Sequence, residues 1–218
     1  MNSDCFIAIY THSCKKYCDD EFFNNLKNSS IGDASIMIVD NSLDINYLDR
    51  LKSITDFPVV HIDIERTDPN MVFHKNVFES VDFLRSKFLA TDCKYFIILE
   101  ADVCPPDRWI QDFKAVINKA DIIGGIYYYG FHRPELWENE IFEYVNHALS
   151  GCTLYKRHII EEFPFRWDPS NLAAFPDAFI CYDVRHSGKN YKIANYSKIK
   201  CRHLTKKESD SRGVEDIE

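Results

Sequence analysis

Four short apolar runs, each ending in polar residues, alternate with amphipathic stretches over the first hundred residues. The runs cover 5–10, 35–39, 59–64 and 95–99, and apolar residues recur at helical spacing between them, most clearly over 77–88. Runs that are apolar at consecutive positions predict strands covered on both faces. Strand–helix alternation predicts right-handed crossovers. We therefore predict an α/β fold with a mostly parallel central sheet and helices on both faces.

The second half of the chain has a looser pattern. It predicts further strands over 121–129, 152–156, 191–194 and 199–202, and helices over 105–117, 134–149 and 176–186. No linker divides the chain, so we predict one domain over 1–204. The remaining residues, 205–218, are almost wholly polar, and we expect a disordered tail there.

Composition narrows the classes of function. Asp and Glu number 34 against 26 Lys and Arg, a formal charge of −8, which disfavours nucleic acid as a partner. No apolar run approaches the roughly 18 residues of a membrane span, and the N-terminus does not resemble a secretory signal. We therefore expect a cytoplasmic protein. The eight cysteines contain no CxxC pair, which favours mostly buried free thiols over zinc ligands or disulfides.

Polar residues follow the predicted strands at one edge of the sheet, where ligands bind in open α/β folds. They include Thr11 and His12, Asp40, and the pair Glu100 and Asp102. Carboxylates gathered at one edge repel each other, and Mg²⁺ or Mn²⁺ would relieve that repulsion. A pair of solvated turn carboxylates is the alternative. The five apolar residues before Glu100 and the Pro-Pro after the pair favour a functional site.

The sequence lacks the motifs of several other classes of protein that bind nucleotides or act on phosphates. There is neither GxGxxG after the first predicted strand nor GxxxxGK[ST], and the chain has only seven glycines. Thr-His-Ser follows the first strand, where a haloacid dehalogenase-type phosphatase carries DxD and a sugar-phosphate nucleotidyltransferase carries a Gly-rich basic loop. These classes are therefore disfavoured.

The segment Tyr95-Phe-Ile-Ile-Leu-Glu-Ala-Asp-Val-Cys-Pro-Pro106 resembles the strand carrying the DXD motif in GT-A-fold glycosyltransferases, especially the family 2-like group. The resemblance extends in order over about residues 5–204. It implies a GT-A fold with a nucleotide-binding half over 1–103 and an acceptor-binding half over 104–204. It also implies a nucleotide-sugar donor and Mn²⁺ or Mg²⁺ as cofactor.

The resemblance assigns roles to residues at matching positions. It implies metal ligation by Glu100, Asp102 and His203, a catalytic base at Asp177, and acceptor contacts from Gly151. It implies nucleotide contacts from Thr11, His12, Asp40, Lys75 and Ala101. Apart from the resemblance, Trp137 and Trp167 are candidates for stacking on a sugar ring, with core packing as the alternative.

Three departures from the family pattern leave alternatives open. Glu100 replaces the first Asp of DXD, Pro176-Asp177 stands in place of Glu-Asp, and QxxRW is absent. Asp177 could equally be a helix N-cap, and His203 an exposed histidine among basic neighbours. The sequence thus supports a metal-dependent, inverting glycosyltransferase acting on an unknown glycan, protein or lipid. A non-catalytic glycosyltransferase-like structural or binding module is the alternative.

Overall fold

A computed structural model of the chain describes residues 3–64, 72–127, 138–148, 151–171 and 175–205. Its strands are β1 (Cys5–Thr11), β2 (Ser35–Asp40), β3 (Val59–His61), β4 (Tyr95–Glu100), β5 (Val103–Cys104), β6 (Ile122–Tyr127), β7 (Phe142–Tyr144), β8 (Cys152–Lys156) and β9 (Ile193–His203). Its helices are η1 (Ser13–Lys15, a 3₁₀ turn), α1 (Asp19–Asn28), α2 (Ile45–Ile54), α3 (Val72–Leu89), α4 (Trp109–Val116), α6 (Arg157–Glu162) and α7 (Pro176–His186).

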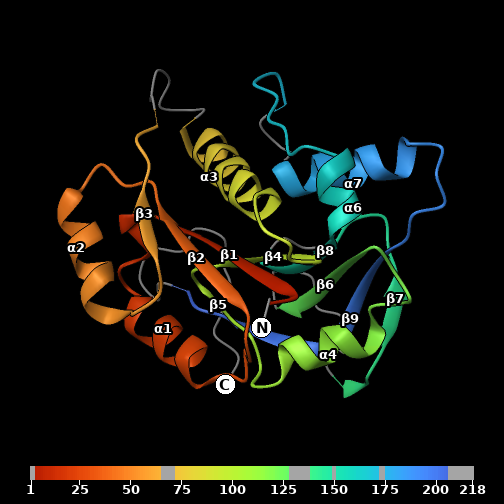
Figure 1. Ribbon diagram of the computed structural model, residues 1–218, viewed down its shortest axis with the longest axis horizontal. Coiled ribbons are helices and arrows are strands. Elements are labelled where there is room, and N and C mark those ends of the chain that lie inside the picture. Colours follow the sequence, from red (N-terminus) through yellow and green to blue (C-terminus); the bar gives the residue numbers. More distant parts are fainter. Residues whose placement is uncertain (1–2, 65–71, 128–137, 149–150, 172–174, 206–218) are drawn as a thin grey trace.

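The strands form one mixed, largely parallel sheet in the order β3-β2-β1-β4-β8-β6-β9-β5, with β7 paired to β9 (Figure 1). Strands β1 to β4 run parallel, whereas β8 lies antiparallel between β4 and β6. The predicted α/β class with helices on both faces is confirmed. The carboxyl ends of β1, β2 and β4 therefore meet at one edge of the sheet.

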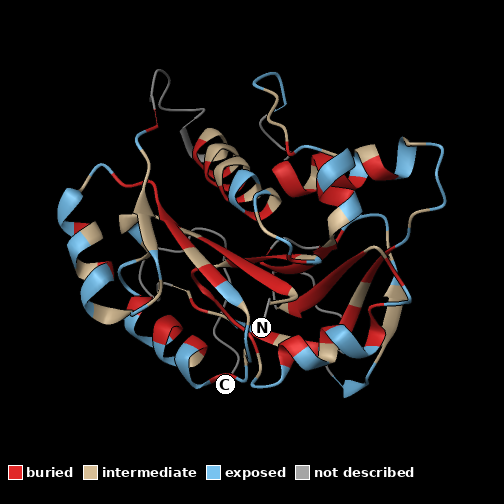
Figure 2. Ribbon diagram, viewed as in Figure 1, coloured by how far each residue is buried: buried red, intermediate tan, exposed pale blue. Residues whose placement is uncertain are grey.

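Two hydrophobic cores lie on opposite faces of this sheet. Cys5, Ile7 and Ile9 of β1 pack on the face covered by α1, α2 and α4. Phe6 and Ala8 point to the other face, where α3, α6 and α7 pack. Figures 1 and 2 show the two helix layers and the buried strands between them. Strands covered on both faces explain why the sequence is apolar at consecutive positions.

The predicted helix over 134–149 is wrong over 139–148, where the chain is not helical. Phe142–Tyr144 form β7, which pairs antiparallel with β9. The Val145 N–H donates to the Ile193 carbonyl at 2.9 Å, and the Ser197 N–H donates to the Ile141 carbonyl at 2.9 Å. Because β9 satisfies these backbone groups, the segment is extended despite the helical spacing of Ile141 and Val145.

The two strands predicted over 191–194 and 199–202 are one continuous strand, β9. Its register against β6 shifts between Gly124 and Ile126, so residues 196–199 of β9 lie opposite Gly125 alone. A Cβ on Gly125 would come 2.9 Å from Ile199 Cγ2. Glycine at this position therefore leaves room for the bulge.

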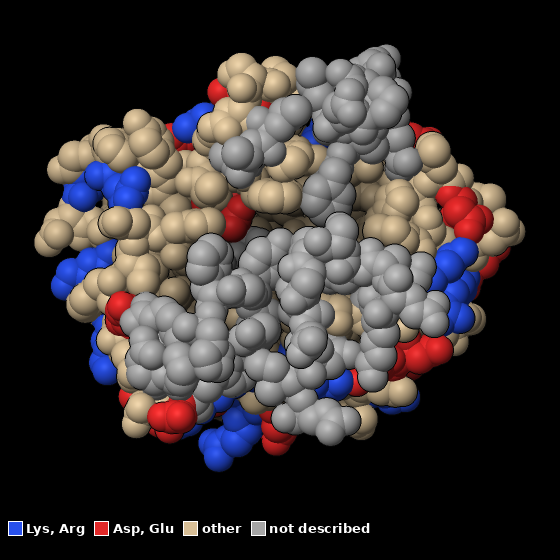
Figure 3. Space-filling model, turned by 180° about the vertical axis from the view of Figure 1, so that it is seen from behind, with Lys and Arg blue, Asp and Glu red and all other residues tan. Residues whose placement is uncertain are grey.

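The predicted thiol state is confirmed, since all eight cysteines are free and all except Cys14 are buried. Within the described residues, no helix combines the length and apolarity needed to cross a membrane. Seen from behind, Lys and Arg alternate with Asp and Glu around the visible rim (Figure 3). Such mixed charge is typical of a solvated surface.

Candidate functional site

A buried carboxylate, Asp102, lies in the turn after β4. Its side chain is fully buried, and its Oδ2 makes an ion pair with the Lys15 ammonium. The Nε2 atom of His203 lies 3.4 Å from the same oxygen. Among the described residues, Oδ1 has no hydrogen-bond partner. Asp102 and His203, separated by half the chain, are thus brought together as the sequence predicted.

Backbone pairing explains why His203 arrives at this position. Val103 of β5 pairs with His203 of β9, and the Leu204 N–H donates to the Asp102 carbonyl at 2.7 Å. The Tyr127 ring lies beside the imidazole, with ring centroids 5.5 Å apart. The strand pair therefore fixes His203 relative to Asp102.

Lys15 was not among the predicted site residues. It ends the 3₁₀ turn η1, which begins after His12, and the His12 Nδ1 accepts the Cys14 N–H at 3.1 Å. His12, which was predicted to contact nucleotide, therefore caps the start of η1. The turn brings a cation to the Asp102 carboxylate, which lies 87 positions further along the chain, so nothing in the local sequence indicates this role.

The Glu100 carboxylate has other partners. It accepts a hydrogen bond from the Tyr10 hydroxyl at 2.8 Å, and the Glu100 N–H donates to the Gly151 carbonyl at 3.0 Å. Burial, followed by the charge of Glu100, raises the pKa of Tyr10 well above its ordinary value. No group of three or more His, Cys, Asp or Glu side chains in the described part of the chain is arranged to hold a metal.

Asp102 and His203 nevertheless fit a divalent cation as two protein ligands. A buried carboxylate oxygen without a hydrogen-bond partner, next to an imidazole, is a suitable donor set. Phosphate oxygens of a substrate commonly complete such sites. Lys15 is a competing cation at the same carboxylate.

Asp40, predicted to contact nucleotide, is fully buried within a polar network. Its Oδ1 accepts hydrogen bonds from the Ser42 N–H at 2.9 Å and the Ser42 hydroxyl at 2.5 Å, and its Oδ2 lies 2.9 Å from Nδ1 of His61. Ser42 in turn accepts the Ser13 N–H at 2.7 Å. Asp40 thus holds the loop after β2 against the start of η1.

Thr11 is also engaged inside the protein. Its hydroxyl lies 2.9 Å from that of Tyr47, which donates to Asp19 at 2.8 Å. The remaining two residues that were predicted to contact nucleotide are Lys75 and Ala101. Lys75 lies 3.6 Å from Glu79 on α3, and Ala101 is buried beside Asp102.

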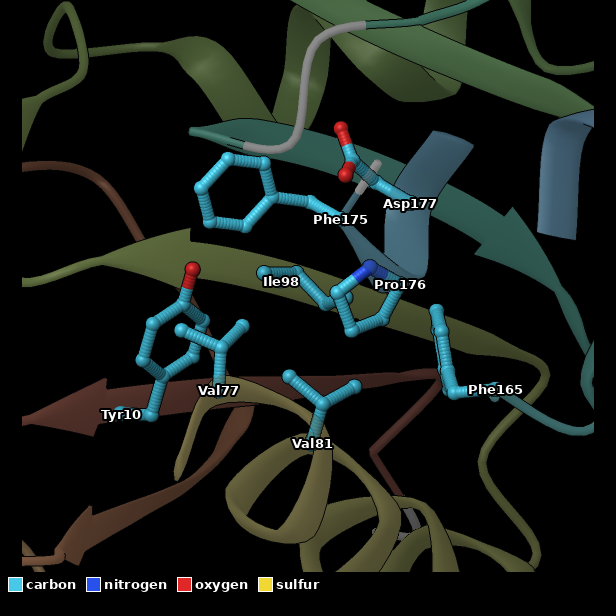
Figure 4. Close-up of a pocket in the computed structure, with 8 residues that line it drawn as sticks. All are labelled: Tyr10, Val77, Val81, Ile98, Phe165, Phe175, Pro176 and Asp177. Atoms are coloured by element: carbon cyan, nitrogen blue, oxygen red, sulfur yellow. The ribbon is translucent and has the colours of Figure 1, made fainter. Parts of the chain in front are cut away.

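A second polar pair lies at the start of α7. Asp177, the predicted base, is nearly buried, and its Oδ2 lies 2.9 Å from Nε2 of His147. Asp177 also borders a small, mostly apolar pocket with Tyr10, Val77 and Phe175 (Figure 4). His147 precedes β8 and was missed, because nothing in its local sequence marks it.

Of the predicted acceptor residues, Gly151 has a clear spatial role. A Cβ there would come 2.5 Å from Cε1 of Tyr127 and 3.0 Å from Cγ2 of Val103. Trp167 is half-buried, and its Nε1 is buried without a hydrogen-bond partner among the described residues. Trp137 lies outside the described residues. Gly151 therefore allows Tyr127 to pack against the backbone beside Glu100.

This topology is that of the GT-A fold, the fold of glycosyltransferases that use nucleotide-sugar donors. No protein-family model matches the sequence, and no curated protein matches it in sequence either. The fold assignment, and the resemblance on which it was predicted, are confirmed by likeness to solved GT-A glycosyltransferases.

Two of these solved structures represent the likeness. The first is S. aureus TarS 1-349 in complex with UDP-GlcNAc, with a TM-score of 0.67 and 14% identity, covering 100% of this chain and 62% of that one. The second is the mannosyltransferase PcManGT from Pyrobaculum calidifontis in complex with GDP-Man and Mn²⁺, with a TM-score of 0.66 and 13% identity. It covers 95% of this chain and 59% of that one. The chain thus spans about three fifths of these proteins.

Proposed function

We propose that the protein is a metal-assisted glycosyltransferase that moves a sugar from a nucleoside diphosphate sugar to a hydroxyl acceptor, with inversion at the anomeric carbon. The observation that carries this proposal is the buried Asp102 carboxylate, with an imidazole and an ammonium gathered on it at the end of β4. The likeness to structures that hold UDP-GlcNAc or GDP-Man with Mn²⁺ supports it.

The reaction needs positive charge where the nucleoside diphosphate leaves. A divalent cation held by Asp102 and His203 supplies that charge when bound. Lys15 adds a second positive charge at the same carboxylate and would face the leaving diphosphate. Glu100, which accepts the Tyr10 hydroxyl, would orient groups of the donor at the end of β4.

The acceptor hydroxyl must lose a proton as its oxygen attacks the sugar. The hydrogen-bonded pair of Asp177 and His147 is the proton-accepting centre in this proposal. Tyr10 links the two ends of the site, since it lines the same pocket as Asp177 and its hydroxyl donates to Glu100. In this proposal the acceptor therefore lies between Asp177 and the end of β4.

Calorimetric titration tests the proposal directly. UDP-GlcNAc, UDP-glucose and GDP-mannose are titrated into the wild-type protein and Asp102→Asn, with and without Mn²⁺. We expect metal-dependent binding of at least one donor to the wild type, weakened at least tenfold by Asp102→Asn and unchanged by Asp92→Asn in the exposed loop before β4. If none of these donors binds under either condition, the proposal is wrong and the non-catalytic module is favoured.

A further inference from the structure

His147 and Asp177 form a pair in which one side chain is much more exposed to solvent than the other. The His147 side chain is 40% exposed, whereas that of Asp177 is 9% exposed. The Asp177 carboxylate lies in the first turn of α7, where the helix dipole favours negative charge. Figure 4 shows this carboxylate at the pocket edge, directed away from Val77 and Val81. The carboxylate is thus the buried member of the pair and the imidazole the accessible one.

Hydrogen bonding assigns the tautomer of His147. A carboxylate only accepts hydrogen bonds, so Nε2 carries the proton that is donated to Asp177 Oδ2 at 2.9 Å. The Nδ1 atom then carries the lone pair, and it has no hydrogen-bond partner among the described residues. The imidazole is therefore prepared to accept a proton at Nδ1.

The pair lies close to the end of β4. Burial, followed by the charges of Glu100 and Asp177, raises the pKa of Tyr10, whose hydroxyl donates to Glu100. Burial, followed by the charges of Cys181, Asp177 and Glu100, raises the pKa of Tyr155, a fully buried residue of β8. Among the described residues, the titratable groups near the pair therefore include Tyr10, Tyr155, Cys181 and Glu100.

We propose that His147 is the base that deprotonates the acceptor and that Asp177 is its positioning residue. This inference rests on the glycosyltransferase function proposed above. As the acceptor oxygen bonds to the anomeric carbon, its proton passes to Nδ1 of His147, and the bond from that carbon to the diphosphate oxygen breaks. The nucleoside diphosphate leaves with the electron pair. Asp177 stabilises the imidazolium, which then returns its proton to solvent.

Donor hydrolysis, with water as the acceptor, tests this assignment in the full-length protein. Release of nucleoside diphosphate from UDP-GlcNAc, UDP-glucose or GDP-mannose is measured for the wild type, His147→Gln and His147→Ala. We expect kcat to fall by about 10²–10⁴-fold in both variants, with donor affinity unchanged. Added imidazole should partly restore His147→Ala but not Asp177→Asn.

The pH profile distinguishes a base from a merely structural residue. The pH dependence of kcat/KM should differ between the wild type and His147→Gln, because the variant lacks the base. An unchanged pH profile in His147→Gln would overturn the assignment. The control is His158→Gln, because His158 is 44% exposed and lies 3.3 Å from Asp121, away from the pocket.

The outcomes separate the two proposals. If the wild type hydrolyses a donor and His147→Gln, folded by circular dichroism, retains kcat within threefold, the assignment of His147 is wrong and the glycosyltransferase proposal stands. If the wild type neither binds nor hydrolyses any of the three donors, both proposals are overturned.

Discussion

The imidazole of His203 lies 3.4 Å from the carboxylate of Asp102, although half the chain separates them in sequence. The contact depends on the pairing of β5 with β9, which sets Val103 opposite His203. Lys15 reaches the same carboxylate from the turn after β1. Three separate stretches of the chain thus meet at one buried carboxylate. The stability of the protein should therefore depend on the cation that pairs with it.

Replacing Lys15 with methionine removes the cation that pairs with buried Asp102. We expect the unfolding free energy to fall by about 3 kcal/mol, because one partner of a buried ion pair is left uncompensated. Mn²⁺ should recover much of this loss in Lys15→Met, since the metal binds the freed carboxylate. Thermal denaturation with and without Mn²⁺ measures both effects. Lys94→Met, at an exposed ion pair with Asp4, is the control. An equal response of both variants to Mn²⁺ would contradict a metal site at Asp102.

Gly151→Ala should destabilise the protein by about 1–3 kcal/mol, because the new methyl group would overlap the Tyr127 ring. Urea denaturation of this variant gives the cost directly. In a Tyr127→Ala background the same substitution should cost much less, since the obstructing ring is gone. Equal costs in both backgrounds would mean that Tyr127 is not what excludes a side chain at this position.

Stability should depend on pH through His61. Its hydrogen bond to Asp40, and more weakly that to exposed Asp63, raise the pKa of His61 above its ordinary value of 6.5. Its contribution is complete below the unfolded-state pKa and is lost as pH rises through the raised folded-state pKa. The difference in unfolding free energy between the wild type and His61→Gln should therefore be larger at about pH 5.5 than at about pH 8.5. A difference that does not change with pH would refute this.

Thiol reagents should distinguish Cys14 from the other cysteines. Burial raises the pKa of Cys5 to about 11 and the pKa of Cys18 and Cys104 to about 12, so these thiols are neutral in mild base. At about pH 8 we expect the folded protein to react with Ellman's reagent at Cys14 alone. Cys14→Ser should abolish the fast reaction, and denaturation should expose the rest. Rapid labelling of Cys14→Ser in the folded state would contradict the burial of these thiols.

The sequence predicts elements better than it predicts the contacts between them. Consecutive apolar residues identify β1, β2 and β4 because both faces of these strands are covered. The interval 142–144 was predicted as helix, because its spacing fits either structure and pairing with β9 decides between them. Asp102 and His203 could be named from their surroundings and a family resemblance. Lys15 and His147 could not, because their roles depend on partners that only the folded chain brings near.

The bulge in β9 helps to set the position of His203. Residues 196–199 face Gly125 alone, and this insertion sets the register in which the rest of β9 continues to His203. A small side chain at Gly125 must displace Ile199, whose carbonyl lies 3.0 Å from where that Cβ would be. Protein engineers who wish to shift the imidazole relative to Asp102 can therefore work at Gly125 and leave Asp102, His203 and Lys15 as they are.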